Sequence, residues 1–338
     1  MLINQDFTHD RTKYLGGSDI GAIFGLSKYR SPLDVWMEKT GKATNEVNNL
    51  PIRFGTFAEE FVASEYASTT GYQVAHQLEP ITHPQHDYLQ GHIDRFVFAK
   101  DSRPDQLPTH VLECKTANPF ARSEWGEVGS DEVPMTYLAQ CHWYLALTQL
   151  ERCDLAVLFG NSDFRIYHIE RDRELEAILV DQAIDFWVQH VQADIPPKPQ
   201  TLVDFQTLFH TEVAGKSIIA SDETVQMIKE FHLLSEELNT KEEAIKGIKQ
   251  NIMAQMGDAE KLTYQDQTLV TWKKPKASMR FDSKRFELER PELFPMYQTP
   301  IATSRRLVIK EWHDKIENIN NQIISNTLSA LGARNEHE

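Results

Sequence analysis

Over residues 1–195, apolar positions alternate between short runs of strand length and longer segments with helical spacing. The short runs predict strands over 73–77, 86–99, 110–115, 153–159 and 164–169. The helical spacing predicts helices over 20–24, 32–39, 54–69, 135–147 and 173–192. Strands that alternate with helices of these lengths favour an α/β core with a mixed central sheet flanked by helices.

The helix predicted over 54–69 has an apolar stripe along one side. Phe57, Ala58, Phe61 and Val62 have the spacing of residues that share a helix face. We therefore expect these four side chains to point into the core.

A proline-rich run at 195–200, with the sequence IPPKPQ, cannot continue a helix and is stiff. It predicts a domain boundary, and we expect three parts of the chain, namely a core over 1–198, a linker with a helical segment over 199–257, and a basic segment over 258–338.

The helical segment over 221–256 carries apolar residues at spacings of three, four or seven. This pattern is typical of a helical hairpin or of a coiled-coil seam, with Lys241 at the one polar seam position. Packing of the seam on its own domain is favoured over packing on a partner helix. The seam residues are Phe231, Leu234, Leu238, Ile245, Ile248, Ile252 and Met256.

Composition excludes several classes of protein. The hydrophobic fraction of 41% is enough for a buried core, yet the chain has no apolar run long enough to cross a membrane and no hydrophobic signal region near its start. We therefore expect a cytoplasmic protein without a membrane partner. The cysteines Cys114, Cys141 and Cys153 have no C-x-x-C spacing and are expected to be small core residues.

The charge of the chain is uneven. The net charge of −15 argues against a protein that coats nucleic acid through bulk positive charge, so any DNA contact needs a local basic surface. Residues 270–310 supply one, with ten Lys or Arg against four acids and with interleaved aromatic residues. This composition suits a surface that grips phosphates and stacks on bases, and equally a solvated basic face around a small aromatic core. The candidate DNA contacts are Lys273, Lys274, Arg305 and Arg306.

The most specific chemistry lies in the sequence Val-Leu-Glu-Cys-Lys at 111–115. In a strand, Glu113 and Lys115 would point the same way, and Leu112 and Cys114 would point into the core. If Asp94 closes the preceding strand beside them, two carboxylates and an amine converge, as a hard divalent cation requires for phosphodiester hydrolysis. The alternative is a cross-strand ion pair on a solvated face.

Other residues complete this candidate site. Glu59 on the helix over 54–69 would be a third carboxylate, with its neighbour Glu60 as the alternative, and three carboxylates suffice for one or two Mg²⁺ ions, or Mn²⁺ in their place. The Cys114 carbonyl could add an oxygen ligand, and Lys115 would orient or deprotonate the attacking water. Gln140 is expected to hold the lysine or the water in place. His92 is expected to be a packed or hydrogen-bonded histidine rather than a ligand.

These residues stand in ordered motifs. The stretch RTKYLGGSDIGAIFG, which contains Arg11-x6-Ser18, is followed by FGTFAEE, GHID, LECK and YLAQCHWYL. In this order they resemble the YqaJ family of viral recombinases, relatives of phage lambda exonuclease among the PD-(D/E)xK nucleases. The resemblance covers about residues 10–195, and the segments TWKKPKAS, FDSKRF and SRRLVIK resemble the C-terminal extension of longer phage members.

The resemblance implies a PD-(D/E)xK, restriction-endonuclease-like core, followed by a C-terminal helical hairpin and a small basic α+β segment. It also implies a metal-dependent exonuclease that degrades one strand of linear duplex DNA from the 5′ end and leaves a 3′ overhang for an annealing protein in phage-type recombination. Matched by motif, Glu59, Asp94 and Glu113 correspond to the metal carboxylates, Lys115 to the catalytic lysine, and Gln140 to the glutamine of the following helix. Arg11 and Ser18 correspond to residues that bind the terminal 5′ phosphate.

Two other functions stay open from the residues alone. The same metal site could serve a structure-specific or restriction-type endonuclease, or the core could be a non-catalytic platform for DNA binding. The resemblance also suggests a homo-oligomer in the cytoplasm of a bacterial or phage-infected cell.

Overall fold

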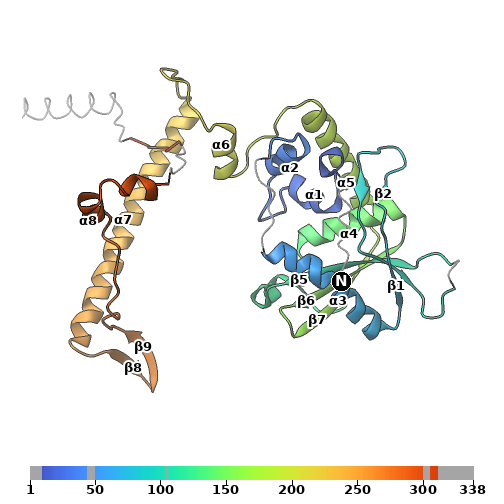
Figure 1. Cartoon of the computed structure of the whole chain (residues 1–338), viewed down its shortest axis with the longest axis horizontal. Helices are drawn as coiled ribbons and strands as arrows, with labels where there is room; N and C mark the ends of the chain where they lie inside the picture. The colour runs from blue at the N-terminus through green and yellow to red at the C-terminus, as the bar shows by residue number, and fades with distance from the viewer. Residues whose placement is uncertain (1–9, 44–49, 104–105, 300–304, 311–338) are drawn as a thin grey trace, which may run out of the picture. The chain divides into compact units, whose positions relative to one another are not determined.

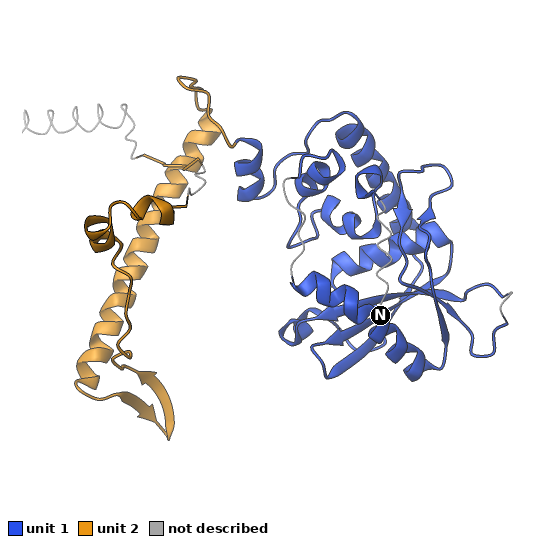
Figure 2. Cartoon of the chain, in the orientation of Figure 1, with its two compact units in different colours: residues 1–209 blue, residues 210–338 orange. Residues whose placement is uncertain are grey.

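The computed structural model describes residues 10–43, 50–103, 106–299 and 305–310. The chain divides into two compact units, which we call unit 1 (residues 1–209) and unit 2 (residues 210–338) (Figure 2). The division after residue 209 lies beyond the end of the proline-rich run at 195–200 that predicts a boundary. Within the described residues, no helix combines the length and the apolar character needed to cross a bilayer.

Unit 1 is built on a five-stranded mixed sheet with the order β1-β4-β5-β6-β7 (Figure 1). Only β5 and β6 run parallel, and the other neighbours are antiparallel. Helix α4 (Met135–Thr148) lies between β5 and β6 in the chain and makes the crossover that a parallel pair needs. The strands are β1 (Gln73–His76), β4 (Arg95–Phe98), β5 (His110–Ala117), β6 (Arg152–Phe159) and β7 (Asp163–Glu170).

Helices cover both faces of this sheet. On one face, α3 (Leu50–Thr70) packs through Val62, Ala63 and Tyr66 against a small apolar cluster. On the other face, α4 packs with α1 (Gly17–Ile23) and α5 (Arg173–Phe186) around the larger core cluster. The expected α/β core with a mixed sheet flanked by helices is therefore confirmed.

Strand β5 shows why its sequence alternates. Leu112 and Cys114 belong to the cluster under α3, whereas Val111 belongs to the cluster under α4. Successive side chains of a strand point to opposite faces, so Glu113 and Lys115 point to the α4 side with Val111. The middle strand of the sheet thus carries two ionisable side chains between two apolar layers.

Shorter elements complete unit 1. Helix α2 (Pro32–Lys39) is capped by Ser31, whose side chain accepts a hydrogen bond from the Asp34 backbone in a capping box, and Pro32 is its first residue. Ser31 also donates a 2.7 Å hydrogen bond to buried Asp204 of α6. These elements are the 3₁₀ turns Arg11–Lys13 and Pro119–Glu124, α2 (Pro32–Lys39), β2 (Ile81–Thr82), β3 (Gln90–Gly91), the π-helix Trp187–Gln192, and α6 (Leu202–Leu208).

Two local predictions for unit 1 are wrong. Phe57 and Phe61 are 77% and 56% exposed, and the inward face of α3 is instead formed by residues such as Ala58 and Val62. Small alanines let the helix lie close to the sheet, so the bulky aromatic rings fall on the outer side. The strand predicted over 86–99 is interrupted, because only β3 and β4 within it are extended.

Unit 2 begins with one long helix, α7 (Asp222–Met256), capped by Ser221 and ended at Gly257, which has a positive φ of 54°. The expected helical hairpin is therefore wrong for this segment, since no turn interrupts the helix. Beyond it lie the expected small α and β elements. They are β8 (Lys261–Tyr264), β9 (Gln267–Thr271), α8 (Ser283–Glu289) and the 3₁₀ turn Phe294–Tyr297.

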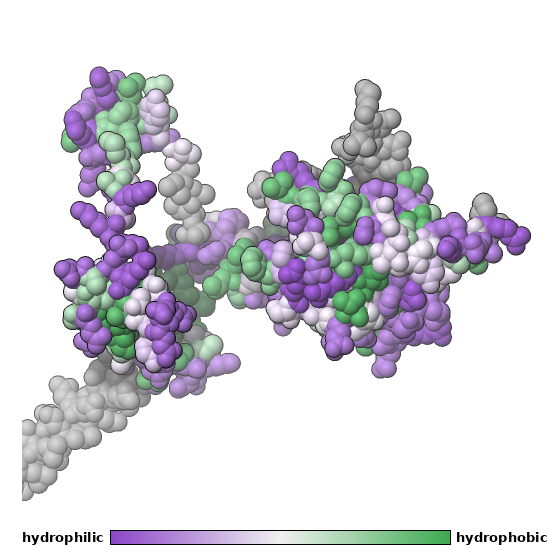
Figure 3. Space-filling model, turned by 90° about the horizontal axis from the view of Figure 1, so that it is seen from below, coloured by the Kyte–Doolittle hydropathy of each residue, from purple (hydrophilic) through white to green (hydrophobic). Residues whose placement is uncertain are grey.

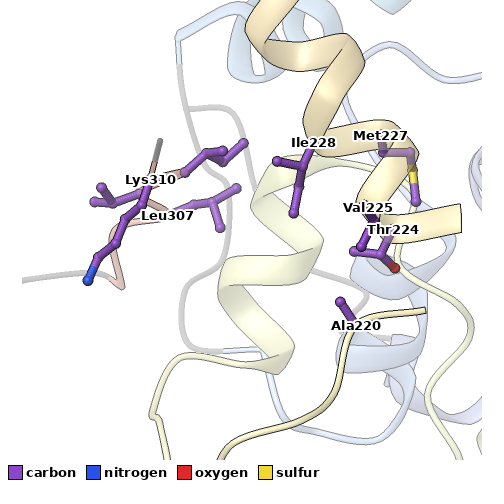
Figure 4. A pocket seen from close by; sticks show the side chains of 9 residues that line it. Ala220, Thr224, Val225, Met227, Ile228, Leu307 and Lys310 are labelled. Carbon is purple, nitrogen blue, oxygen red and sulfur yellow. The ribbon is translucent and has the colours of Figure 1, made fainter. Parts of the chain in front are cut away.

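Apolar side chains remain on the surface of unit 2. The seam residues Phe231, Leu238 and Ile248 of α7 are exposed, and apolar and polar side chains lie next to each other on the surface (Figure 3). A cavity of about 780 Å³ lies between the first turns of α7 and residues 307–310 (Figure 4). His232 hydrogen-bonds the Lys310 carbonyl at 3.2 Å beside it.

Candidate functional site

The pairing of β4 with β5 brings two carboxyl groups together. Arg95 pairs with Leu112, so Asp94, one residue before β4, is level with Glu113 on β5. Residues at paired positions in an antiparallel ladder carry their side chains on the same face. Asp94 therefore lies in the bend before β4, and the expectation that it closes a preceding strand is wrong. Its carboxyl group nevertheless lies beside that of Glu113, as expected.

The two carboxyl groups are buried and strongly perturbed. Burial raises the pKa of Asp94 well above its ordinary value, and the nearby carboxylates of Glu113 and Glu59 raise it further. Burial also raises the pKa of Glu113, although Lys115 acts against it. Since both carboxyl groups are buried close together, the pair shares a proton more readily than it carries two charges.

Lys115 supplies the positive charge of the site. Its Nζ forms an ion pair with Glu113 Oε1 and lies 5.4 Å from the centre of the Tyr137 ring. Burial alone would lower the pKa of Lys115, but the carboxylates of Glu113 and Asp94 outweigh it and hold that pKa above its ordinary value. The amine is thus a cation when the acids beside it are ionised.

Gln140, on helix α4, holds Glu113 from the other side. Its Nε2 donates 2.8 Å hydrogen bonds to Glu113 Oε1 and to the Tyr144 hydroxyl oxygen one turn later. Both side chains are buried. The position of the Glu113 carboxylate is therefore determined by contacts from β5 and from α4 together.

Glu59 and Glu60 share one partner at the edge of the site. Buried Arg95 donates to Glu59 Oε1 at 2.7 Å and to Glu60 Oε2 at 2.6 Å, and a third hydrogen bond goes to the Asp94 carbonyl. Glu60 is 82% exposed and Glu59 28% exposed. Glu59 is also the one that acts on the pKa values of Asp94 and Glu113.

The donor atoms fit a hard cation. Glu113 Oε2 is buried without a hydrogen-bond partner, and an unpaired buried carboxylate oxygen is costly. Asp94 and Glu113 offer oxygen ligands only, and Mg²⁺ binds through one or two carboxylates while it keeps several waters. The described residues contain no group of three or more His, Cys, Asp or Glu side chains placed to hold a metal, and Glu59 accepts a hydrogen bond from Arg95.

Arg11 and Ser18 come together near the start of the chain. Arg11 Nη2 donates a 3.0 Å hydrogen bond to Ser18 Oγ, and the Arg11 side chain is half exposed. Fully buried Asp19 lies 3.6 Å from Arg11 and forms tighter ion pairs with Arg30 at 2.8 Å and with Lys39 at 2.9 Å. A buried acid thus gathers three cations beside the exposed Ser18 hydroxyl.

Close packing on Tyr144 connects this cluster with the carboxylates. A Cβ at Gly17 would lie 2.7 Å from the Tyr144 ring, and one at Gly91 would lie 3.2 Å from it. A side chain would clash at either position, which explains Gly17 of the GGSD motif and Gly91 of the GHID motif. Tyr144 in turn accepts the Gln140 hydrogen bond, so the first helix, the Asp94 segment and α4 meet at one ring.

The remaining candidates lie in three places. The backbone N–H of Cys114 donates a 2.8 Å hydrogen bond to Asp94 Oδ2, while its thiol is buried in the cluster under α3. His92 hydrogen-bonds the Tyr14 hydroxyl at 3.0 Å. In unit 2, Lys273 pairs with Glu260, and the other three basic candidates are exposed, namely Lys274, Arg305 and Arg306.

Sequence reasoning missed several residues that shape the site. The partners of Arg95, Tyr144 and Asp19 come from other elements, so no sequence spacing connects these residues to the site. Asp19 alone could have been noticed for another reason, because an acidic residue in the first turn of α1 completes a capping box. All three cysteines are buried and free, as expected of small core residues.

The fold and the site together define a mixed α/β protein with paired buried carboxyls and a lysine on the middle strand of its sheet. Residues 6–151 match the family model of the YqaJ-like viral recombinase domain. The chain is also 27% identical over 309 residues to the uncharacterized protein YqaJ of Bacillus subtilis. That alignment covers 89% of this chain and 92% of the relative.

Two solved exonucleases are similar to part of this chain. The alkaline exonuclease LHK-Exo from Laribacter hongkongensis is 19% identical, with a TM-score of 0.43, and the similarity covers 55% of this chain and 91% of that one. A phage related exonuclease from Haemophilus somnus 129PT is 14% identical, with a TM-score of 0.37 and coverage of 54% and 96%.

Proposed function

We propose that this protein is a metal-dependent DNA exonuclease that degrades one strand of linear duplex DNA from the 5′ end and leaves a 3′ overhang for phage-type recombination. The observation that carries the proposal is the buried pair of Asp94 and Glu113 beside Lys115, with one Glu113 oxygen lacking a partner. A divalent cation stabilises two buried carboxylates better than the single positive charge of one lysine does. The match of residues 6–151 to the YqaJ-like viral recombinase domain supports the substrate class.

Asp94 and Glu113 would hold Mg²⁺, or Mn²⁺ in its place, with Glu59 and the Cys114 carbonyl as further oxygen ligands. When bound, the ion polarises the phosphodiester and lowers the pKa of water. The Lys115 amine orients the attacking water and balances negative charge on the phosphate. Gln140 keeps the Glu113 carboxylate in position through its 2.8 Å hydrogen bond.

The end of the substrate would be bound by Arg11 and Ser18. A guanidinium grips phosphate oxygens in pairs, and the Ser18 hydroxyl already lies 3.0 Å from it. The exposed basic side chains of unit 2, Lys273, Lys274, Arg305 and Arg306, would hold the DNA backbone elsewhere. An annealing protein and further copies of this chain are the expected partners, in the cytoplasm of a bacterial or phage-infected cell.

The test is an assay of the purified protein on end-labelled DNA with Mg²⁺. We expect degradation of linear duplex, faster with a 5′ phosphate than with a 5′ hydroxyl, and no attack on covalently closed circles. Nicking of closed circles would favour the alternative of a structure-specific or restriction-type endonuclease. Tight binding without any cleavage would favour a non-catalytic platform.

Replacement of Lys115 by alanine tests the role of the amine. We expect Lys115→Ala to lower kcat by about 10²-fold or more, because general acid–base and charge-stabilising groups contribute effects of this size. DNA binding, measured by fluorescence anisotropy, should remain. Lys100→Ala, which removes an exposed lysine outside the site, is the matched control. Equal activity in the two variants would contradict the proposed role.

A further inference from the structure

A groove of about 390 Å³ opens beside the carboxyl end of strand β5. One wall is the first turns of α3, and the other is the segment that directly follows Lys115. The residues that define its shape are Pro51, Phe54, Thr116, Asn118, Pro119 and Gly160. Its volume is within the range of pockets that take small organic molecules.

The walls of the groove are held in place by close packing. Gly160 has a φ of +64°, and a Cβ there would lie 2.8 Å from the Pro119 ring. A Cβ at Gly55 would lie 3.8 Å from Thr116 Oγ1, so α3 is close to β5 at this level. Asn118 Oδ1 accepts a 3.0 Å hydrogen bond from the Phe120 backbone. The groove is therefore preformed.

The groove and the candidate active site are built on the same two elements, α3 and β5. Thr116 is the next residue after Lys115 on β5, with its side chain on the α3 face of the sheet and that of Lys115 on the α4 face, and Phe54 lies little more than one helical turn before Glu59 on α3. Glu59 is close enough to Asp94 and Glu113 to raise the pKa of Asp94. A DNA strand with a phosphate at these carboxylates would have an adjoining nucleotide at the groove.

The chemistry of the lining suits a base rather than a phosphate. Of the described residues that line the groove, none is charged. The Phe54 ring is 47% exposed, and aromatic rings stack on bases without strong sequence preference. The Thr116 hydroxyl and the Asn118 amide can form hydrogen bonds with the edge of a heterocycle.

We propose that this groove holds a nucleobase of the strand being degraded, next to the scissile phosphodiester, with Phe54 as the stacking residue. The proposal rests on the proposed function, because the substrate is the same DNA strand. It adds a subsite that positions the nucleotide through its base, separate from the groups that bind phosphate.

The test uses full-length protein and duplexes that carry one 2-aminopurine or one abasic site at successive positions from the 5′ end. Phe54→Ala removes the ring, and Phe54→Leu keeps an apolar side chain of similar bulk without an aromatic face. Phe57→Ala is the matched control, since Phe57 is on the same helix, is more exposed and does not line the groove. Fluorescence is read with Ca²⁺ in place of Mg²⁺, and kcat/KM is read with Mg²⁺.

For wild type and Phe57→Ala, we expect quenching of 2-aminopurine at one position and a loss of about tenfold in kcat/KM when that base is absent. For both Phe54 variants, that quenching should be lost and removal of the base should cost nothing further. Unchanged quenching in the Phe54 variants, or no sensitivity to any abasic site, would overturn the proposal. So would a change of oligomeric mass in Phe54→Ala with base sensitivity retained, because a second copy would then occupy the groove.

Hydrolysis of bis(p-nitrophenyl) phosphate by the wild-type protein separates this proposal from the proposed function. That substrate contains a phosphodiester and no base. If it is not cleaved with Mg²⁺ or Mn²⁺, the metal-dependent hydrolase is contradicted, while the fluorescence result still decides whether the groove takes a base.

Discussion

At the scale of single residues, the arrangement of the candidate site lowers the stability of the folded protein. Asp94 and Glu113 are buried side by side, and their raised pKa values reflect the cost of charging two acids in one place. The Glu113 oxygen without a partner adds to that cost. Functional sites commonly retain such unfavourable arrangements because the reaction needs them.

Asp94→Asn should therefore stabilise the metal-free protein while it removes activity. The amide keeps an acceptor for the Cys114 N–H and removes one of two like charges. We expect a gain of about 1 kcal/mol, or about 2–4 °C in Tm for a unit of this size, together with loss of nuclease activity. Differential scanning calorimetry in EDTA measures the first effect.

The same variant also tests the ion. Addition of Mg²⁺ should raise the Tm of the wild-type protein, since a ligand that binds only the folded state stabilises it. In Asp94→Asn this rise should be lost. A metal-dependent shift of equal size in both proteins would show that the ion binds elsewhere.

At the scale of elements, the sequence predicts strands better than helix faces. The alternation of Leu112 and Cys114 with Glu113 and Lys115 was sufficient to predict β5 and to predict that its two charged side chains share one face. The apolar stripe of α3 was misleading, because Phe57 and Phe61 are larger than the alanines that face the sheet. Which side of a helix is buried depends on how closely its neighbour approaches, and this is not written in the helix alone.

The same distinction applies to the site. Glu113 and Lys115 are two residues apart, so a local pattern predicts their proximity. Arg95 contacts Glu59 and Glu60 across two elements, and its role depends on the register between β4 and β5 and on the position of α3. No single-sequence pattern encodes those relations.

A second polar cluster ties four elements together away from the site. Buried Asp154 on β6 accepts hydrogen bonds from Tyr66 of α3 at 2.5 Å and from Arg152 at 3.0 Å, and it contacts His110 of β5 and His168 of β7. Burial would raise the pKa of Asp154, but the hydrogen bonds from His110, Tyr66 and His168 outweigh it and hold the pKa well below 3.8.

This cluster predicts the acid sensitivity of unit 1. Because the folded pKa of Asp154 is lower than the unfolded one, its contribution is complete above the unfolded value of 3.8 and is lost as the pH falls through the folded value. Asp154→Asn should lose about 3 kcal/mol at pH 7, since Arg152 is left without its charge partner, and its stability should fall less steeply at acid pH. Urea unfolding between pH 2 and 7 measures both.

Asp181→Asn, at an exposed position of α5, is the control for removal of one negative charge. It should unfold as the wild-type protein does at every pH. Parallel pH profiles for the wild type and Asp154→Asn would contradict the assignment of acid sensitivity to this cluster.

At the scale of the whole molecule, helix α6 belongs to unit 1 although it follows the proline-rich run. Asp204 is 2% exposed and accepts hydrogen bonds from Ser31 and from the backbone of Gln200 and Thr201. The sequence predicts the boundary from the prolines, which stiffen the chain. It gives no sign that the chain folds back onto α2 just beyond them.

Truncation should distinguish these two positions. We expect residues 1–209 to fold with nearly the thermal stability of unit 1 in the full chain. Residues 1–198 should be less stable by about 1–3 kcal/mol, because Ser31 loses its buried partner. Circular dichroism on heating compares the two, and equal Tm values would place the boundary at the proline-rich run.

The protein truncated to residues 1–209 also tests the basic segment of unit 2. If its lysines and arginines hold the DNA backbone, residues 1–209 should bind DNA more weakly and with a smaller dependence on salt than the full chain, while cleavage remains. Anisotropy titrations over a range of NaCl concentrations measure the slope. An unchanged slope would exclude the segment from DNA contact.

The parallel pairing of β5 with β6 also determines when the segment that carries Glu113 and Lys115 forms during folding. Because the two strands can align only after the intervening helix has crossed the sheet, the segment with Glu113 and Lys115 is completed late, when distant parts of the chain have met. Its amides should exchange with deuterium only through global opening, unlike those of frayed ends or surface loops. Turnover by the proposed nuclease would then report on the intact native state, and partially unfolded forms should contribute nothing to it.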